Sequence, residues 1–107
     1  NLGVVYGKLG RHTKAIDAYK QAIRINPDYA EAHFVLGMTY GELGRYTEAI
    51  AAGKQAIRIN PDYVEAHFGL GLTYLILGDK SSALEEYMIL KDLDRNLANK
   101  LLNVIYE

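Results

Sequence analysis

The sequence predicts an all-α solenoid of antiparallel helix pairs, and three observations lead to this prediction. The chain repeats with a period of 34 residues, since residues 2–25 match residues 36–59 at 17 of 24 positions. Within each period, small and apolar residues recur at helical spacing. Glycine and then Asn-Pro interrupt these segments at equivalent points, as at Gly44 and Asn60-Pro61. We therefore expect two helices per period and about seven helices in all.

The first repeat, residues 1–25, is incomplete. Asn1 aligns with Val35, which has five predicted helical residues before it, so the first helix of this pair is expected to be truncated. Gly10 stands where Gly44 and Gly78 stand in the later repeats, and we expect it to end that first helix. The chain is thus expected to be a fragment of a longer repeat array.

The second and third repeats, residues 26–59 and 60–93, are complete. Helices are predicted over about residues 30–43 and 46–59, with the same pair one period later. Each pair is preceded by an aspartate with a glutamate three residues on, a variant of the capping box: Asp28 with Glu31, and Asp62 with Glu65.

The remaining residues, 94–107, predict a closing helix over about 96–106. Leu97, Leu101, Val104 and Ile105 form an apolar stripe that would pack on the third repeat. The whole chain, residues 1–107, is accordingly expected to fold as a single domain.

Composition argues against several functions. A formal charge of −1 offers no basic surface for nucleic acid, and no apolar run approaches the length that membrane insertion needs. There is no cysteine, which excludes disulfides and thiolate metal sites. We expect a soluble, cytoplasmic protein.

No catalytic, cofactor or metal site can be assembled from the reactive side chains. His33 and His67 lie one repeat apart, too far to share a metal ion, and are predicted to be partly buried rings. Ser81 and Ser82 stand near a helix start and have no histidine nearby in the sequence. We therefore expect no enzyme activity and no cofactor.

The pattern resembles the tetratricopeptide repeat (TPR), which has a 34-residue period. The residues that carry the resemblance in the second repeat are His33, Leu36, Gly37, Tyr40, Ala49 and Pro61. Two positions depart from the family pattern: Gly53 replaces an aromatic residue, and Arg95 replaces proline. The resemblance implies a right-handed superhelix with a concave groove that binds proteins or peptides.

The first helix of each pair is apolar on two sides, and a face of this kind is either buried by neighbours or open to a partner. The resemblance assigns the second face to the groove, with expected binding residues Val4, Glu31, Phe34, Met38, Glu65, Phe68, Leu72 and Ile76. The alternative is that Phe34 and Phe68 pack between adjacent first helices.

Two functions are compatible with this surface. The first is a module that binds an apolar peptide or an amphipathic helix in the groove. The basic residues with which some members of the family clamp an acidic C-terminus are absent, because Val4, Phe34, Val35, Met38, Glu65 and Gly69 stand at those places. The ligand is therefore expected to be apolar with a basic element. The second function is a structural spacer, or a scaffold that self-associates through exposed repeat ends into a homo-oligomer.

Glycine and alanine mark the closest helix contacts. Gly37 with Ala49, and Gly71 with Ala83, are expected to let two backbones approach. Gly53 stands where the flanking repeats carry Tyr19 and Tyr87, and we expect the next repeat's first helix or a neighbouring chain to fill that space.

Overall fold

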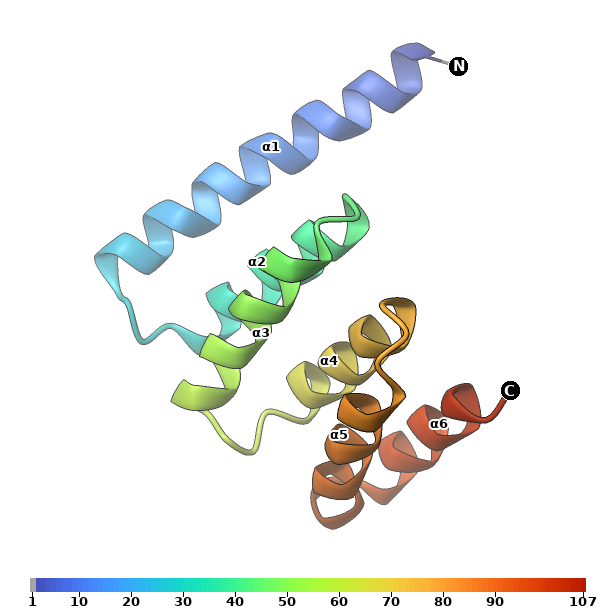
Figure 1. Cartoon of the computed structure of the whole chain (residues 1–107). Helices are drawn as coiled ribbons and strands as arrows, with labels where there is room; N and C mark the ends of the chain where they lie inside the picture. Colours follow the sequence, from blue (N-terminus) through green and yellow to red (C-terminus); the bar gives the residue numbers. More distant parts are fainter. Residues whose placement is uncertain (1) are drawn as a thin grey trace.

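The computed structural model describes the backbone of residues 2–107 and the side chains of residues 10–107. The described chain folds into six α-helices that stack in sequence order (Figure 1): α1 (Leu2–Ile25), α2 (Ala30–Glu42), α3 (Tyr46–Ile59), α4 (Val64–Ile76), α5 (Lys80–Leu93) and α6 (Arg95–Ile105). Helices α2 and α3 form one pair, and α4 and α5 form the next. The predicted all-α solenoid is confirmed.

Glycine turns close both complete pairs. Gly44 and Gly78 adopt φ angles of 75° and 79°, a region that residues with a Cβ rarely enter. At the end of α2 the Gly44 N–H donates to the Gly41 carbonyl at 3.0 Å, and the Arg45 N–H donates to the Tyr40 carbonyl at 2.9 Å. These bonds satisfy carbonyls that the helix end leaves without partners, so the chain reverses within a few residues.

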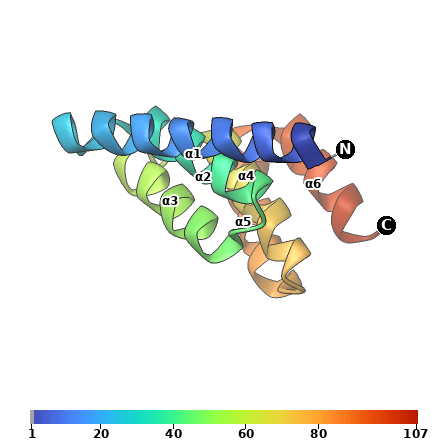
Figure 2. The same cartoon turned by 90° about the horizontal axis from the view of Figure 1, so that it is seen from above.

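The expected turn at Gly10 is wrong. Helix α1 runs without interruption from Leu2 to Ile25, and Gly10 is helical within it (Figure 2). A continuous helix bonds the backbone groups around Gly10 internally, whereas a turn would expose them. This is why the described chain has six helices instead of about seven.

The predicted capping boxes are also wrong. Tyr29 and Tyr63 occupy the N-cap positions of α2 and α4, and neither makes a side-chain cap bond. The N–H of Asp28 instead donates to the Asn26 side chain at 3.3 Å, and the same bond recurs between Asp62 and Asn60. The Asn-Pro-Asp sequence therefore orders the turn before the helix.

Side-chain caps do occur at the last two helices, on Asp79 and Asp94. The Ser82 N–H donates to Asp79 Oδ1 at 3.1 Å and the Ser82 hydroxyl donates to Oδ2 at 2.6 Å. These hydrogen bonds hold the pKa of the Asp79 carboxyl below its ordinary value. The α5 cap is consequently favourable only while Asp79 is ionised.

Replacing Asp79 with alanine is expected to lower the melting temperature at pH 7, with a difference from wild type that shrinks as the pH falls below about 4. The sign follows from the depressed pKa, since such a group stabilises above its unfolded-state pKa and loses this contribution as it is protonated. Thermal melts followed by circular dichroism at pH 7 and pH 3 measure both differences. An equal difference at the two pH values would show that the carboxylate is not the capping group.

Two apolar clusters form the core. The first joins α1, α2 and α3 through Ile16, Leu36, Tyr40, Ala49 and Ala52. The second is formed by residues of α5 and α6, namely Ala83, Leu90, Ala98, Leu101 and Ile105. Helix α6 packs against the third repeat with Leu101 and Ile105 buried and Leu97 partly buried. Val104, which was predicted to lie on the same packed stripe, is 41% exposed.

Gly53 of α3 faces α4, and the space beside it is occupied. A Cβ atom added at Gly53 would lie 3.1 Å from both Cγ and Cδ2 of Leu70, a buried residue of α4. The first helix of the next repeat therefore fills the place of the missing tyrosine ring with its own leucine.

His67 of α4 contacts both α5 and the turn that precedes α4. Its ring is 3% exposed, with Nδ1 2.7 Å from the Glu86 carboxylate on α5 and Nε2 2.8 Å from the Pro61 carbonyl. His33 makes the equivalent carbonyl contact to Pro27 at 3.0 Å, but Ala52 stands where Glu86 would be. Both rings are thus held by a proline carbonyl of their own repeat. His33 is partly buried as predicted, whereas His67 is fully buried.

Candidate functional site

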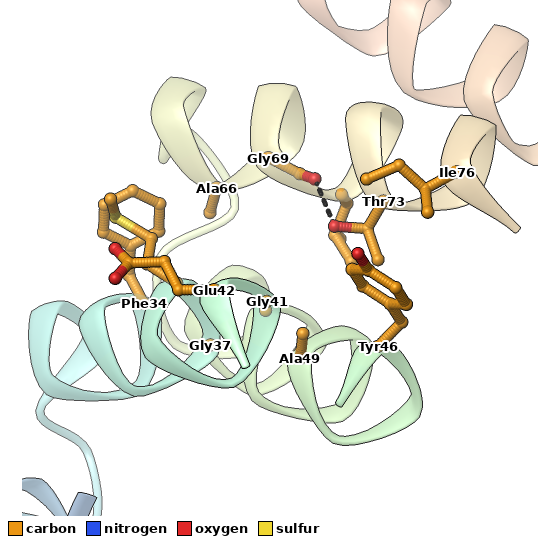
Figure 3. Close-up of a pocket in the computed structure, with 13 residues that line it drawn as sticks. Phe34, Gly37, Gly41, Glu42, Tyr46, Ala49, Ala66, Gly69, Thr73 and Ile76 are labelled. Carbon is orange, nitrogen blue, oxygen red and sulfur yellow. Dashed lines mark hydrogen bonds between the residues drawn. The ribbon is translucent and has the colours of Figure 1, made fainter. Parts of the chain in front are cut away.

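A groove of about 290 Å³ lies between α2, α3 and α4. In Figure 3, Ala66, Gly69, Thr73 and Ile76 of α4 face Phe34, Glu42, Tyr46 and Ala49 across it. Gly37, Met38, Gly41, Gly53 and Leu70 complete the lining. Most of these side chains are apolar or absent, so the groove offers an apolar surface with few polar groups.

Small residues make the base of the groove possible. A Cβ atom at Gly37 would lie 3.1 Å from the Ala49 carbonyl oxygen and 3.3 Å from the Ala52 Cβ, so the backbones of α2 and α3 touch there. The predicted approach of Gly37 and Ala49 is thus observed. Gly41 has no such neighbour within 4 Å, and Gly69 has only Phe34 Cε1 at 4.0 Å. These two glycines leave space that a ligand side chain could enter.

Larger side chains form the walls. Met38 on α2 is 50% exposed and Ile76 on α4 is 60% exposed, although both are apolar. Phe34 is half-buried, and its ring lies 5.0 Å from the Tyr63 ring with an interplanar angle of 42°. This contact holds the Phe34 ring at one wall.

The structure brings only part of the predicted groove together. Phe34, Met38 and Ile76 line it. Phe68 and Leu72 are partly buried and pack against the cluster that α5 and α6 form, so they do not line the groove. The predicted residue Val4 lies in α1, and its side chain is outside the described residues.

Two predicted binding residues, Glu31 and Glu65, are exposed but do not line the groove. Their charges act on Tyr63 instead. Burial raises the pKa of the Tyr63 phenol, and the negative charges of Glu31 and Glu65 raise it further. Because the Tyr63 ring contacts the Phe34 ring, these carboxylates place negative charge near that wall of the groove.

Sequence reasoning missed Tyr46 and Glu42, which also line the groove. Tyr46 is the first residue of α3, on the second helix of the pair, while the predicted site used only first helices. Glu42 ends α2 on the same helix face as Phe34 and Met38, but it was not among the predicted binding residues. The His12 Nε2 atom lies 2.6 Å from its carboxylate.

The described residues contain no group of three metal-ligating side chains within reach of a common ion. Among the same residues, no helix is both long enough and apolar enough to cross a membrane.

Comparison with protein families gives two matches, both described as tetratricopeptide repeat, over residues 1–64 and 42–103. Each match covers more than half of the chain. The chain belongs to the tetratricopeptide repeat family. TPR domains are generally interaction modules without enzymatic activity. No curated protein matches the sequence.

Solved structures agree with this TPR assignment. The crystal structure of MamA is 30% identical with a TM-score of 0.78, and the match covers 92% of this chain but only 57% of the MamA chain. The first TPR domain of Spaghetti (RPAP3), bound to the HSP90 peptide SRMEEVD, has a TM-score of 0.84 at 24% identity, with 97% and 84% of the two chains covered. The TPR2B domain of yeast Sti1, in a complex with pHsp70, has a TM-score of 0.81 at 23% identity, covering 97% and 87%. The last two likenesses show the fold.

Proposed function

We propose that the chain is a protein-interaction module that binds an apolar peptide or amphipathic helix carrying basic residues, in the groove between α2 and α4. The observation that carries this proposal is the exposure of Met38 and Ile76 on facing walls of an apolar groove. Binding would bury both side chains and release the water that covers them.

The charged residues near the groove indicate that the ligand carries basic residues beside its apolar anchor. Helices α2 and α4 carry Glu31, Glu42 and Glu65 but no lysine or arginine. The HSP90 peptide bound by RPAP3, SRMEEVD, is acidic near its end. Of the three glutamates, only Glu42 lines the groove. An acidic tail would be repelled by this carboxylate, whereas a ligand with lysine or arginine beside its apolar anchor is attracted.

Selection from a random peptide library tests the proposal directly. The immobilised chain captures peptides displayed on phage, and the captured sequences are expected to combine an apolar anchor with lysine or arginine. Enrichment of acidic C-terminal tails, or of no sequence class, would contradict the proposed ligand.

A peptide selected in this way is expected to bind the Met38→Ser, Ile76→Ser double variant at least about tenfold more weakly, because the apolar contact area is lost. Isothermal titration calorimetry measures the change. The matched control is Met88→Ser, Ile89→Ser on α5, where the same residue types are 56% and 41% exposed outside the groove. Equal affinities of the two double variants would place the binding site elsewhere.

A further inference from the structure

A second depression, of about 340 Å³, is lined by residues of α1, α2 and α3, none of which lines the groove. We call it the His33 depression, and its lining consists of Lys20, Ile23, His33, Leu36, Tyr40, Glu48, Ala51, Ala52 and Gln55. The buried members of this set are apolar or aromatic, whereas the charged members are exposed. The depression therefore combines a buried apolar part with an exposed charged part.

Internal repetition shows which group occupies the equivalent position one repeat later. His67 and Glu86 stand 34 residues after His33 and Ala52. In the third repeat the Glu86 carboxylate lies 2.7 Å from His67 Nδ1, and its side chain is 13% exposed. In the second repeat Ala52 has no carboxylate to offer to His33. The same arrangement thus occurs twice, and only the third repeat completes it with a glutamate of its own.

The Nδ1 atom of His33 can accept or donate a further hydrogen bond. Its Nε2 atom lies 3.0 Å from the Pro27 carbonyl oxygen, and no described residue partners Nδ1. Among the same residues no buried side-chain nitrogen lacks a partner, so Nδ1 reaches the surface. Because a carbonyl oxygen only accepts, Nε2 carries a hydrogen, and Nδ1 binds a carboxylate when it is protonated as well.

The charges around the depression favour an acidic group. Lys20 is exposed, and the acidic residue of the lining, Glu48, is already paired. Arg45 Nε and Nη2 donate to the two oxygens of Glu48 at 2.7 and 2.6 Å. These hydrogen bonds, together with the charges of Arg45 and Lys20, hold the pKa of the Glu48 carboxyl below its ordinary value. Because Arg45 balances Glu48, the charge of Lys20 remains to attract an anion.

We propose that the His33 depression is a second protein-docking site, which takes a glutamate side chain of a partner protein against His33 Nδ1. The partner's glutamate would stand where Glu86 stands in the third repeat, and Lys20 would attract it. An apolar side chain next to that glutamate would cover Ile23, which is only partly buried. This site is separate from the groove and does not depend on groove binding.

Peptide selection with a subtraction step tests the proposal. Phage-displayed peptides with a fixed central glutamate and random flanking residues are selected on the wild-type chain and depleted on Ala52→Glu, whose own carboxylate would occupy His33. This variant is expected to fold, since the third repeat accommodates Glu86 at the equivalent place. Peptides with an apolar residue next to the glutamate are expected to remain. Survival of no sequence class would overturn the proposal.

Calorimetric titration of a selected peptide, acetylated and without histidine, identifies the group that binds. Replacing its glutamate with glutamine, or using Ala52→Glu, is expected to weaken binding by about tenfold or more, because a charged hydrogen bond is lost. The matched control, Ala51→Glu, adds the same charge where the third repeat carries the exposed Glu85, and it should weaken binding by no more than about threefold. Equal binding of the glutamine peptide, or equal losses in the two variants, would contradict docking at His33.

A change of pH gives a readout that does not depend on Ala52→Glu. A carboxylate binds at Nδ1 together with a proton, so the wild-type affinity is expected to rise by about fivefold or more from pH 8 to pH 6. Lys20, Tyr40 and Glu48 supply the other ionisable groups of the lining, and the ordinary pKa values of these residue types lie outside this interval. An affinity that stays constant or falls would mean that the peptide donates to a neutral ring, which would overturn the proposal.

Two further variants separate the His33 depression from the groove. His33→Phe keeps an aromatic ring but removes both nitrogens, so it is expected to bind the peptide about tenfold more weakly or worse. The Met38→Ser, Ile76→Ser double variant should bind it as the wild type does, because neither residue lines the depression. Full binding by His33→Phe, or loss of binding in the groove variant, would overturn the proposal.

Discussion

Replacing Gly71 with leucine is expected to lower the free energy of unfolding by about 3 kcal/mol, because the added side chain overpacks the third repeat. A Cβ atom at Gly71 would lie 2.6 Å from Leu101 Cδ2 and 3.0 Å from Cδ1. Leu101 is completely buried beside Leu90 and Ala98, so it has little space to move into. Urea denaturation followed by circular dichroism measures the loss.

Gly69 provides the matched control on the same helix. An added Cβ there meets only Phe34 Cε1 at 4.0 Å, so Gly69→Ala is expected to stabilise α4 by up to about 1 kcal/mol. Gly71→Ala should destabilise it. Adding Leu101→Ala to Gly71→Leu should recover part of the loss, since the two side chains compete for one volume. A loss below about 1 kcal/mol in Gly71→Leu would refute the close contact between α4 and α6.

Gly53→Tyr is the second large effect, with an expected loss of about 2 kcal/mol or more. A tyrosine there would restore the residue type of the other two repeats, and it would improve local helix propensity. The Leu70 side chain nevertheless occupies the space, with Cγ and Cδ2 at 3.1 Å from an added Cβ. Overpacking therefore outweighs propensity.

Chemical denaturation of Gly53→Tyr, alone and combined with Leu70→Ala, measures the change in the free energy of unfolding. The double variant should lose less than the sum of the two single variants, because the ring enters the space that Leu70 leaves. Stabilisation by Gly53→Tyr alone would mean that the space between α3 and α4 at this position is not filled by Leu70.

The sequence predicted the fold well where glycine and proline act locally. Helix α3 spans Tyr46–Ile59 as expected, since a Gly44 turn precedes it and Asn60-Pro61 follows it. The same reasoning failed at Gly10. Leu-Gly-Arg occurs both at residues 9–11 and at 43–45, yet only the second is a turn. A turn depends on the packing of the two helices that it joins, which local sequence does not record.

The candidate site was predicted only in part for a related reason. Helical spacing placed Phe34, Met38 and Ile76 on one face, and all three line the groove. The same spacing included Phe68 and Leu72, which pack towards the cluster beneath α5 and α6. Spacing defines a helix face but not the neighbour that covers it, so the position of α6 had to come from the structure.

The most direct test of groove binding uses the backbone amides of the glycines as reporters in an NMR titration with a selected basic, apolar peptide. Gly37, Gly41, Gly53 and Gly69 line the groove, whereas Gly10, Gly44 and Gly78 lie outside it. The proposed function predicts that the first four resonances shift or broaden during the titration and that the other three stay in place. Shifts confined to Gly10, Gly44 and Gly78, or no shift while the peptide binds, would contradict it.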